Sequence, residues 1–176
     1  MLAAASELMM EGGVEAVTVD EVARRSGVAK STMYRHFESV DDLVIAALDQ
    51  MVGEVAAPDS GSLRADLRAV VLAFRGVIER SQFRCLFASM LVRSLDDPEF
   101  ARVFRRAQEV RHAPLRQAIQ RGIARGEVDP AIDVDQAMYF VQGPFIGKRL
   151  IEDDQLTEDD IEVFLDLVVK ALAPAT

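Results

Sequence analysis

The stretch Thr18–Phe37, TVDEVARRSGVAKSTMYRHF, decides the fold of this chain, because it reads as two short helices joined by a glycine turn. Thr18 stands where it can cap the first helix, and Glu21, three residues later, is placed to complete a capping box. Gly27 stands where the chain turns sharply, a position that favours a residue tolerant of positive φ. Two helices joined in this way form a helix-turn-helix, whose second helix can enter the major groove of DNA.

The second helix of this motif gathers basic and hydroxyl side chains between two apolar anchors, Val28 and Phe37. In this geometry, side chains near the N-terminus of the helix meet base edges, while flanking side chains bind phosphates. We expect Lys30 and Ser31 to face bases, and Arg35 to contact a base or a phosphate. The predicted DNA-contacting residues are Thr18, Lys30, Ser31, Thr32, Tyr34, Arg35 and His36. The alternative is a solvated polar face that contacts nothing.

The N-terminal part of the chain resembles the DNA-binding domain of the tetracycline-repressor (TetR) family of bacterial transcription regulators. Ala4–Gly12 is similar to the family's first helix, Thr18–Val28 to the second and Ala29–Phe37 to the recognition helix. Glu38–Leu48 resembles the start of the fourth helix, which joins the DNA-binding head to the body of these proteins. The resemblance implies an all-α regulator that binds double-stranded operator DNA.

Two residues depart from the family's pattern. Val40 stands where such sequences often carry a lysine, which puts one phosphate contact in doubt. Ala29 replaces the serine that commonly opens the recognition helix, which removes an N-cap worth about 1 kcal/mol. The chain also begins without the basic stretch that usually precedes the first helix. These departures support a different reading, in which a helical ligand- or protein-binding dimer has lost DNA binding.

The charge of the chain is uneven along its length. A formal net charge of −9 argues against a protein that coats nucleic acid without regard to sequence. Within Thr18–Phe37, however, basic side chains outnumber acidic ones, and Arg24 and Arg25 either reach the DNA backbone or are solvated. Acidic side chains concentrate instead between Glu152 and Asp166. The charge distribution therefore predicts that the N-terminal part of the chain, and not its C-terminal part, binds DNA.

Composition also limits the compartment and the chemistry. Cys85 is the only cysteine, so an intrachain disulfide is impossible, and its apolar neighbours predict a buried thiol. No apolar run reaches the roughly 18 residues of a membrane span, and no secretory leader is recognisable. We expect a soluble cytoplasmic protein without a membrane partner. Two histidines and one cysteine do not support a catalytic triad or a thiolate metal site, so we expect no catalytic residue, metal or cofactor.

Apolar residues recur at intervals of three and four along most of the chain, which predicts an all-α fold. We divide the chain into a three-helix helix-turn-helix head, residues 1–46, and a helical effector-binding and dimerisation body, residues 47–176. Pro114 either kinks a long helix or starts a new one. The helices predicted after the head are Val40–Val52, one from Leu63, Phe83–Leu95, one from Pro98, Asp133–Ile151 and one capped by Thr157.

The family resemblance implies a small-molecule effector in the body. Its middle helices are rich in aromatic residues and methionine, with a few polar side chains among them, as in an apolar pocket with convergent polar groups. The predicted pocket residues are Phe74, Phe83, Phe87, Met90, Leu91, Phe104, Gln108, Arg111, Met138, Gln142 and Phe145. The alternatives are that these residues form ordinary helical core, and that the protein binds DNA without an effector.

A homodimer follows from the docking of one helix in one major groove, because two half-sites and a two-fold axis are then expected. The last two long helices are the predicted interface, where two glycines four residues apart allow a partner helix to approach closely. The predicted interface residues are Phe140, Gly143, Gly147, Ile151, Phe164, Leu165 and Val168. Packing of these residues within their own subunit is the alternative.

Overall fold

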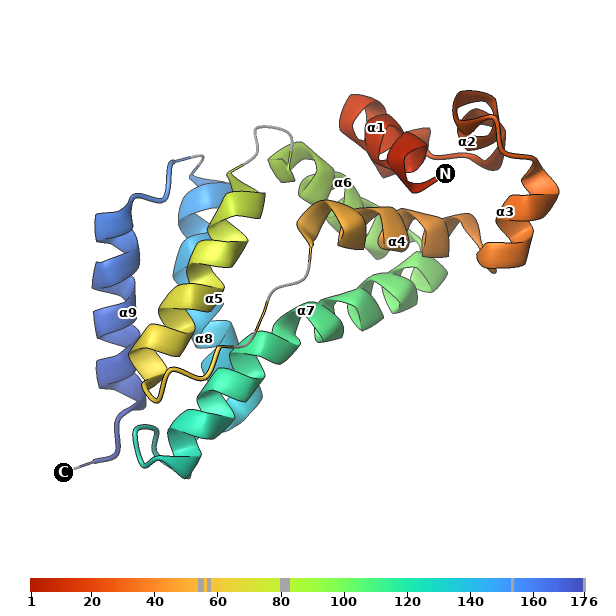
Figure 1. Cartoon of the computed structure of the whole chain (residues 1–176). Helices are drawn as coiled ribbons and strands as arrows, with labels where there is room; N and C mark the ends of the chain where they lie inside the picture. The colour runs from red at the N-terminus through yellow and green to blue at the C-terminus, as the bar shows by residue number, and fades with distance from the viewer. Residues whose placement is uncertain (54–55, 57, 80–82, 153, 176) are drawn as a thin grey trace. The chain divides into compact units, whose positions relative to one another are not determined.

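The computed structural model describes residues 1–53, 56, 58–79, 83–152 and 154–175, and every regular element within them is a helix (Figure 1). The predicted all-α fold class is therefore confirmed. The chain divides into two compact units, unit 1 with Met1–Glu54 and Arg80–Glu109, and unit 2 with Val55–Glu79 and Val110–Thr176.

Unit 1 holds the helix-turn-helix together with helices that come later in the sequence. Its elements are α1 (Leu2–Gly12), the 3-10 helix η1 (Val14–Ala16), α2 (Val19–Ser26), α3 (Lys30–His36), α4 (Val40–Val52), α6 (Phe83–Asp96) and the first part of α7 (Pro98–Ala124). One apolar core joins them, with α1 and α4 as its centre. Its members with the least exposed side chains are Ala5, Met9, Val14, Val22, Leu43, Val44, Ala47, Leu48, Met90 and Phe100.

Local signals in the sequence set the ends of the short helices. The Thr18 hydroxyl accepts a hydrogen bond from the Glu21 amide at 3.2 Å, which confirms the predicted cap of α2. Gly27 ends α2 with a φ of 70°, the left-handed conformation that its position predicted. The second half of the predicted capping box is wrong, because the Glu21 carboxylate is hydrogen-bonded to Arg24 instead. Ser39 caps α4 in a full capping box with Asp42.

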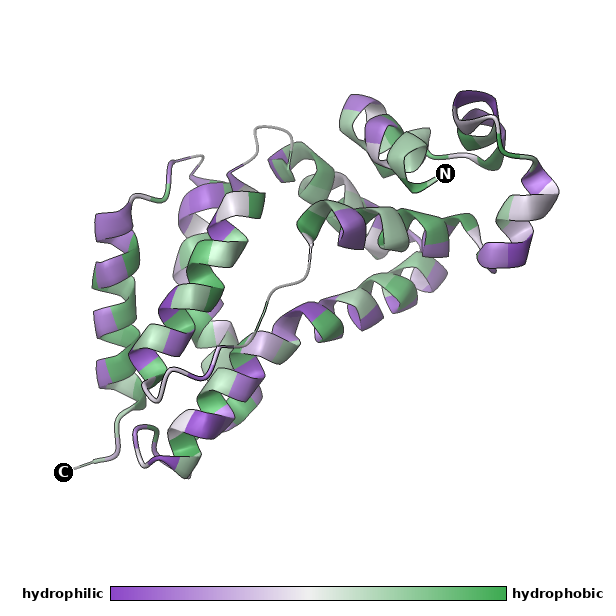
Figure 2. Ribbon diagram, viewed as in Figure 1, coloured by the Kyte–Doolittle hydropathy of each residue, from purple (hydrophilic) through white to green (hydrophobic). Residues whose placement is uncertain are grey.

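Unit 2 is a second apolar core between amphipathic helices, whose green faces turn toward one another in Figure 2. Its elements are α5 (Leu63–Ile78), the second part of α7, α8 (Val134–Ile146), the π-helix η2 (Gly147–Ile151) and α9 (Glu158–Leu172). The N-terminus of α5 is capped by a side chain that lies far away in the sequence. The Leu63 amide donates a hydrogen bond to the Glu127 carboxylate at 2.7 Å. Thr157 and Asp160 form the predicted capping box of α9.

The helices of the body answer two questions, whether Pro114 interrupts a helix and whether Cys85 is buried. α7 runs through Pro114 as one helix, and Leu115 and Ile119 beyond the proline are buried in the core of unit 2. Cys85 is exposed, and the prediction of a buried thiol is wrong. α6 turns Leu86 and Met90, four residues apart, into the core of unit 1, and this leaves the neighbouring Cys85 in solvent.

The described part of the chain holds no helix with the length and apolar character needed to cross a membrane. It also holds no group of three or more His, Cys, Asp or Glu side chains able to bind a metal ion. Asp153, in the acidic run between Glu152 and Asp166, lies outside the described residues.

Candidate nucleic-acid interface

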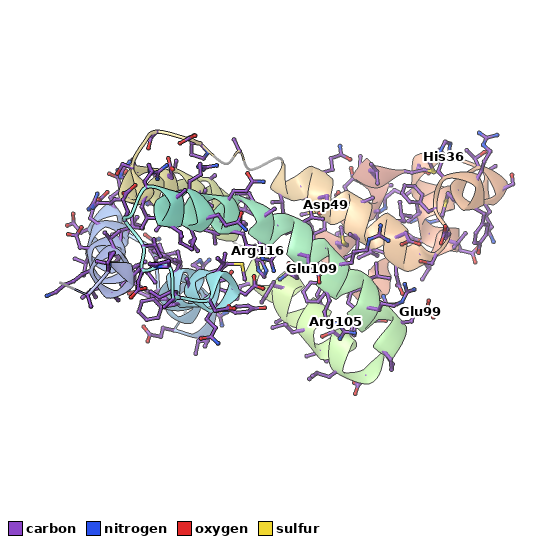
Figure 3. The ribbon with its side chains drawn as sticks, turned by 90° about the horizontal axis from the view of Figure 1, so that it is seen from below. His36, Asp49, Glu99, Arg105, Glu109 and Arg116 are labelled. Atoms are coloured by element: carbon purple, nitrogen blue, oxygen red, sulfur yellow. The ribbon has the colours of Figure 1, made fainter. Side chains whose placement is uncertain are left out.

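Helix α3 presents most of its side chains to solvent and buries one, Met33, in the core of unit 1. Met33 is buried at 3% exposure, whereas Tyr34 is 62% exposed. Figure 3 marks His36 on the last turn of this helix. Of the predicted contact residues, Thr18, Lys30, Ser31, Tyr34, Arg35 and His36 are exposed, and Thr32 is half-buried. Six of these seven residues thus lie on α3, and Thr18 stands apart as the N-cap of α2.

Lys30 has an ionic partner inside the head. Its ammonium forms an ion pair with the carboxylate of Asp20, in the first turn of α2, with side-chain exposures of 54% and 79% respectively. No local sequence signal predicts this pair, because the two residues stand ten positions apart and meet only through the turn at Gly27.

Arg24 and Arg25, for which two roles were open, also pair with carboxylates of the head. The guanidinium of Arg25 donates two hydrogen bonds to Glu11, at 2.7 and 2.8 Å, and so ties α2 to α1. These hydrogen bonds lower the pKa of Glu11, although desolvation of its carboxylate opposes the effect. Arg24 donates to Glu21 within α2 at 3.0 Å.

Arg35 differs from these three cations. Within the residues that the structure describes, its guanidinium is exposed and lies in no ion pair. The four basic side chains of residues 1–53 are Arg24, Arg25, Lys30 and Arg35, and acidic side chains outnumber them. Among the described residues, Arg35 is therefore the basic side chain of residues 1–53 that forms no ion pair.

One arginine of α6 fixes the start of α4, just after the recognition helix. Arg93 Nη2 lies 2.5 Å from Asp41 Oδ1 and 3.4 Å from Asp97 Oδ2. Its guanidinium carbon lies 4.3 Å from the centroid of the Phe100 ring, a cation–π geometry. Burial raises the pKa of Asp41 even though the Arg93 charge opposes this shift. This cluster connects α4 with α6 and the first turn of α7, all within unit 1.

The predicted interface residues fall into two groups within unit 2. Phe140, Gly143 and Ile151 are exposed, whereas Leu165 and Val168 are 0% and 2% exposed. Leu165 and Val168 belong to the core of their own subunit, because α9 turns them toward α5 and α8, and they offer a partner no surface. Gly147 and Phe164 are half-buried, and Phe164 meets the Phe145 ring edge-on at 5.4 Å. Further exposed apolar side chains of α8 and α9, outside the predicted interface set, are Tyr139, Ile146, Val163 and Leu167.

The predicted pocket residues belong to both units. Those of unit 1 are Phe83, Phe87, Met90, Leu91, Phe104 and Gln108, and those of unit 2 are Phe74, Arg111, Met138, Gln142 and Phe145. Met90 and Phe104 are buried in the core of unit 1, and Met138 and Phe145 in that of unit 2, whereas Leu91 is 44% exposed. In unit 2, Gln142 Nε2 lies 3.5 Å from His112 Nε2. Six of the predicted pocket residues are parts of the two apolar cores, namely Phe87, Met90 and Phe104 in unit 1 and Phe74, Met138 and Phe145 in unit 2.

Family models match both parts of the chain. Residues 1–47 match "Bacterial regulatory proteins, tetR family". Residues 57–168 match "Tetracyclin repressor-like, C-terminal domain". The helix-turn-helix and the helical body thus each match the corresponding part of one family.

Individual proteins agree with these matches. The chain is 31% identical over 180 residues to the HTH-type transcriptional activator FasR of Mycolicibacterium smegmatis, covering 92% of this chain and 78% of the relative. The TetR family transcription regulator SCO0332 has a crystal structure with a TM-score of 0.76 and 25% identity, covering 98% of this chain and 96% of the other. The regulator FadR of Bacillus subtilis, solved with stearoyl-CoA, shares the fold at a TM-score of 0.65 and 20% identity, covering 99% and 97%.

The matches settle the biochemical class. They concern helix-turn-helix proteins that regulate transcription, so the expectation that this chain is not an enzyme is confirmed by its relatives. With the helix-turn-helix at residues 18–37 and the exposed polar face of α3, the chain belongs to the TetR family of helix-turn-helix DNA-binding transcriptional regulators.

Proposed function

We propose that this protein works as a homodimer that binds operator DNA through α3, represses transcription there, and leaves the operator when a small molecule binds its body. The observation that carries the proposal is the exposed polar face of α3, held to unit 1 by the buried Met33. Arg35 supports it further, since an exposed cation with no counter-ion among the described residues is suited to a phosphate or a guanine edge.

The partner for the dimer is a second copy of this chain. A single recognition helix reads only a few base pairs, and a two-fold axis presents two of them to two half-sites. Exposed apolar side chains on α8 and α9 provide a surface for such an axis, notably Phe140 at 50%, Val163 at 56% and Leu167 at 59% exposure. Gly143 and Gly147 leave open space where a side chain would begin, which favours close approach of a partner helix.

The effector acts, in this proposal, by favouring a conformation whose two recognition helices are wrongly spaced for the operator. A ligand of equal affinity for both conformations would release nothing, so differential binding is required. The shift passes through α4, whose first turn is held by the pair between Asp41 and Arg93. The apolar content of the body favours an amphipathic or apolar ligand, and a structure of the same fold with stearoyl-CoA agrees with that class.

The test is binding of the purified dimer to the DNA upstream of its own gene. We expect sequence-selective binding of two chains, with a footprint of two related half-sites, and weaker binding to a shuffled duplex of equal length and composition. Equal affinity for both duplexes would contradict the proposal. Addition of stearoyl-CoA to the operator complex then tests release by a ligand of the proposed class.

Activation of transcription is the second candidate, because the FasR relative is named as an activator. Both kinds of regulator present the same helix to DNA, so the two differ in where the operator lies relative to the promoter. Transcription in vitro from the upstream promoter distinguishes them. A fall in transcript on addition of the protein supports repression, and a rise supports activation.

A further inference from the structure

The N-terminal turn of α3 meets a carboxylate that the DNA-binding role does not require. Lys30, at the start of α3, and Asp20, in the first turn of α2, are brought together by the left-handed turn at Gly27. Both side chains remain more than half exposed in the pair. The Asp20 carboxylate therefore holds the Lys30 ammonium at the same surface that DNA must approach.

The ion pair between Arg25 and Glu11 has a structural role that the pair of Lys30 and Asp20 lacks. Arg25 joins α2 to α1 through Glu11, with its own side chain 23% exposed. The pair of Lys30 and Asp20 is exposed on both sides, and a surface ion pair of this kind changes an equilibrium by only about one- to fivefold. DNA can therefore displace Asp20 from Lys30. The free energy needed to break the ion pair is still large enough to affect which DNA sequences bind.

We propose that Asp20 is a selectivity residue, which keeps Lys30 from the phosphates of DNA in general and gives it up to the base edges of the operator. The inference rests on the proposed reading of the operator by α3. On non-operator DNA, Lys30 gains only a screened phosphate contact, and losing the Asp20 carboxylate offsets that gain. On the operator, a base acceptor such as the O6 and N7 atoms of guanine offers Lys30 a directed contact in the groove.

Asp20→Asn is the variant that tests the inference, with binding measured by fluorescence anisotropy on operator and shuffled duplexes. We expect D20N to bind the shuffled duplex about threefold to tenfold more tightly at low salt, since each dimer frees two lysines. The dependence of log K on log salt should steepen by about 0.9 for each lysine that engages a phosphate. The ratio of operator to shuffled affinity should fall.

A double-mutant cycle with Lys30→Met separates this effect from a general loss of negative charge. The gain from D20N should disappear in the K30M background, because there is no lysine left to release. Glu38→Gln is the matched control, since Glu38 is an exposed acid just beyond the other end of α3. Any gain from E38Q should persist in the K30M background.

Each outcome bears on one proposal. Unchanged affinity of D20N for the shuffled duplex, or an equal gain with and without Lys30, would overturn the role of Asp20 while leaving operator binding intact. A wild-type protein that does not distinguish the operator would instead overturn the proposed function. Asp20 also lies in the first turn of α2, where a carboxylate favours the helix, so Asp20→Ser and thermal unfolding of every variant verify that the head stays folded.

Discussion

Arg35 is the side chain with the most direct bearing on DNA binding, because it is exposed and unpaired within the described residues. We predict that Arg35→Ala weakens operator binding about tenfold or more, as expected for a lost hydrogen bond from a charged group in each subunit. The salt dependence should become shallower by about 0.9 for each phosphate contact that is lost. Anisotropy titrations of operator DNA at several salt concentrations measure both quantities.

Arg105→Ala is the control for this change, because Arg105 is another exposed arginine, on the first part of α7 (Figure 3). Its removal should leave operator affinity and salt dependence as in the wild type. Equal losses in R35A and R105A would mean that total charge, rather than the position of Arg35 on α3, governs binding.

Single residues also show which contacts can be predicted from the sequence and which cannot. Thr18 and Gly27 were predictable as cap and turn, since each acts on the backbone within a few residues of itself. The pair between Lys30 and Asp20 was not, because its formation depends on the turn between two helices. Glu21 had two partners within reach, and its side chain pairs with Arg24 rather than with the backbone of Thr18.

Helix α9 begins with a capping box whose acidic member also holds α9 to η2. Asp160 accepts hydrogen bonds from the Thr157 hydroxyl and amide and from the Lys148 ammonium, which lies 3.0 Å away. These contacts lower the pKa of Asp160 from 3.8 to about 2. Because this pKa is lower in the folded chain, ionised Asp160 stabilises the fold above pH 3.8, and the contribution is lost as pH falls through about 2.

We predict that Asp160→Asn lowers the melting temperature at neutral pH, and that the difference from wild type narrows as pH falls below 3.8. Thermal unfolding of both proteins over a pH series measures this difference. Asp159→Asn, in the same turn of α9, is the control and should show no such narrowing. A difference for D160N that stays constant down to the lowest pH at which the wild type is folded would contradict the assignment.

Whole helices were more predictable than their faces. The start of α4 at Val40 and of α5 at Leu63 followed from apolar periodicity. The same periodicity does not distinguish an interface residue from a core residue, which is why it predicts Leu165 in the interface although Leu165 lies in the core. The sequence does not identify Val163 and Leu167 as exposed for the same reason, since an exposed apolar side chain has the same sequence pattern as a core residue.

The assembly of two chains is tested by a charge placed on the exposed face of α9. We predict that Leu167→Glu dissociates the dimer without unfolding the subunit, because Leu167 is 59% exposed and makes no part of the core. Sedimentation velocity at micromolar protein and circular dichroism measure mass and helix content. Operator affinity should fall with the dimer, since a single subunit contacts only one half-site.

Two further variants separate assembly from folding. Leu95→Glu, at an 83% exposed position on α6, is the matched control and should leave the dimer intact. Leu165→Ala should destabilise the subunit by about 2–5 kcal/mol, as for other buried leucines, without a specific effect on assembly. If L167E keeps the mass of a dimer, the proposed interface on this face of α9 is wrong.

Sequence-selective binding of the wild-type protein to the DNA upstream of its own gene, measured across a salt series, tests the whole proposal most directly. The predicted result is tight binding of two chains to the operator, with log K falling by about 0.9 for each phosphate neutralised as log salt rises. We also predict that the protein binds the operator more tightly than a shuffled duplex at every salt concentration. Binding that is absent at low salt while the dimer is intact, or equal for both duplexes, would contradict it.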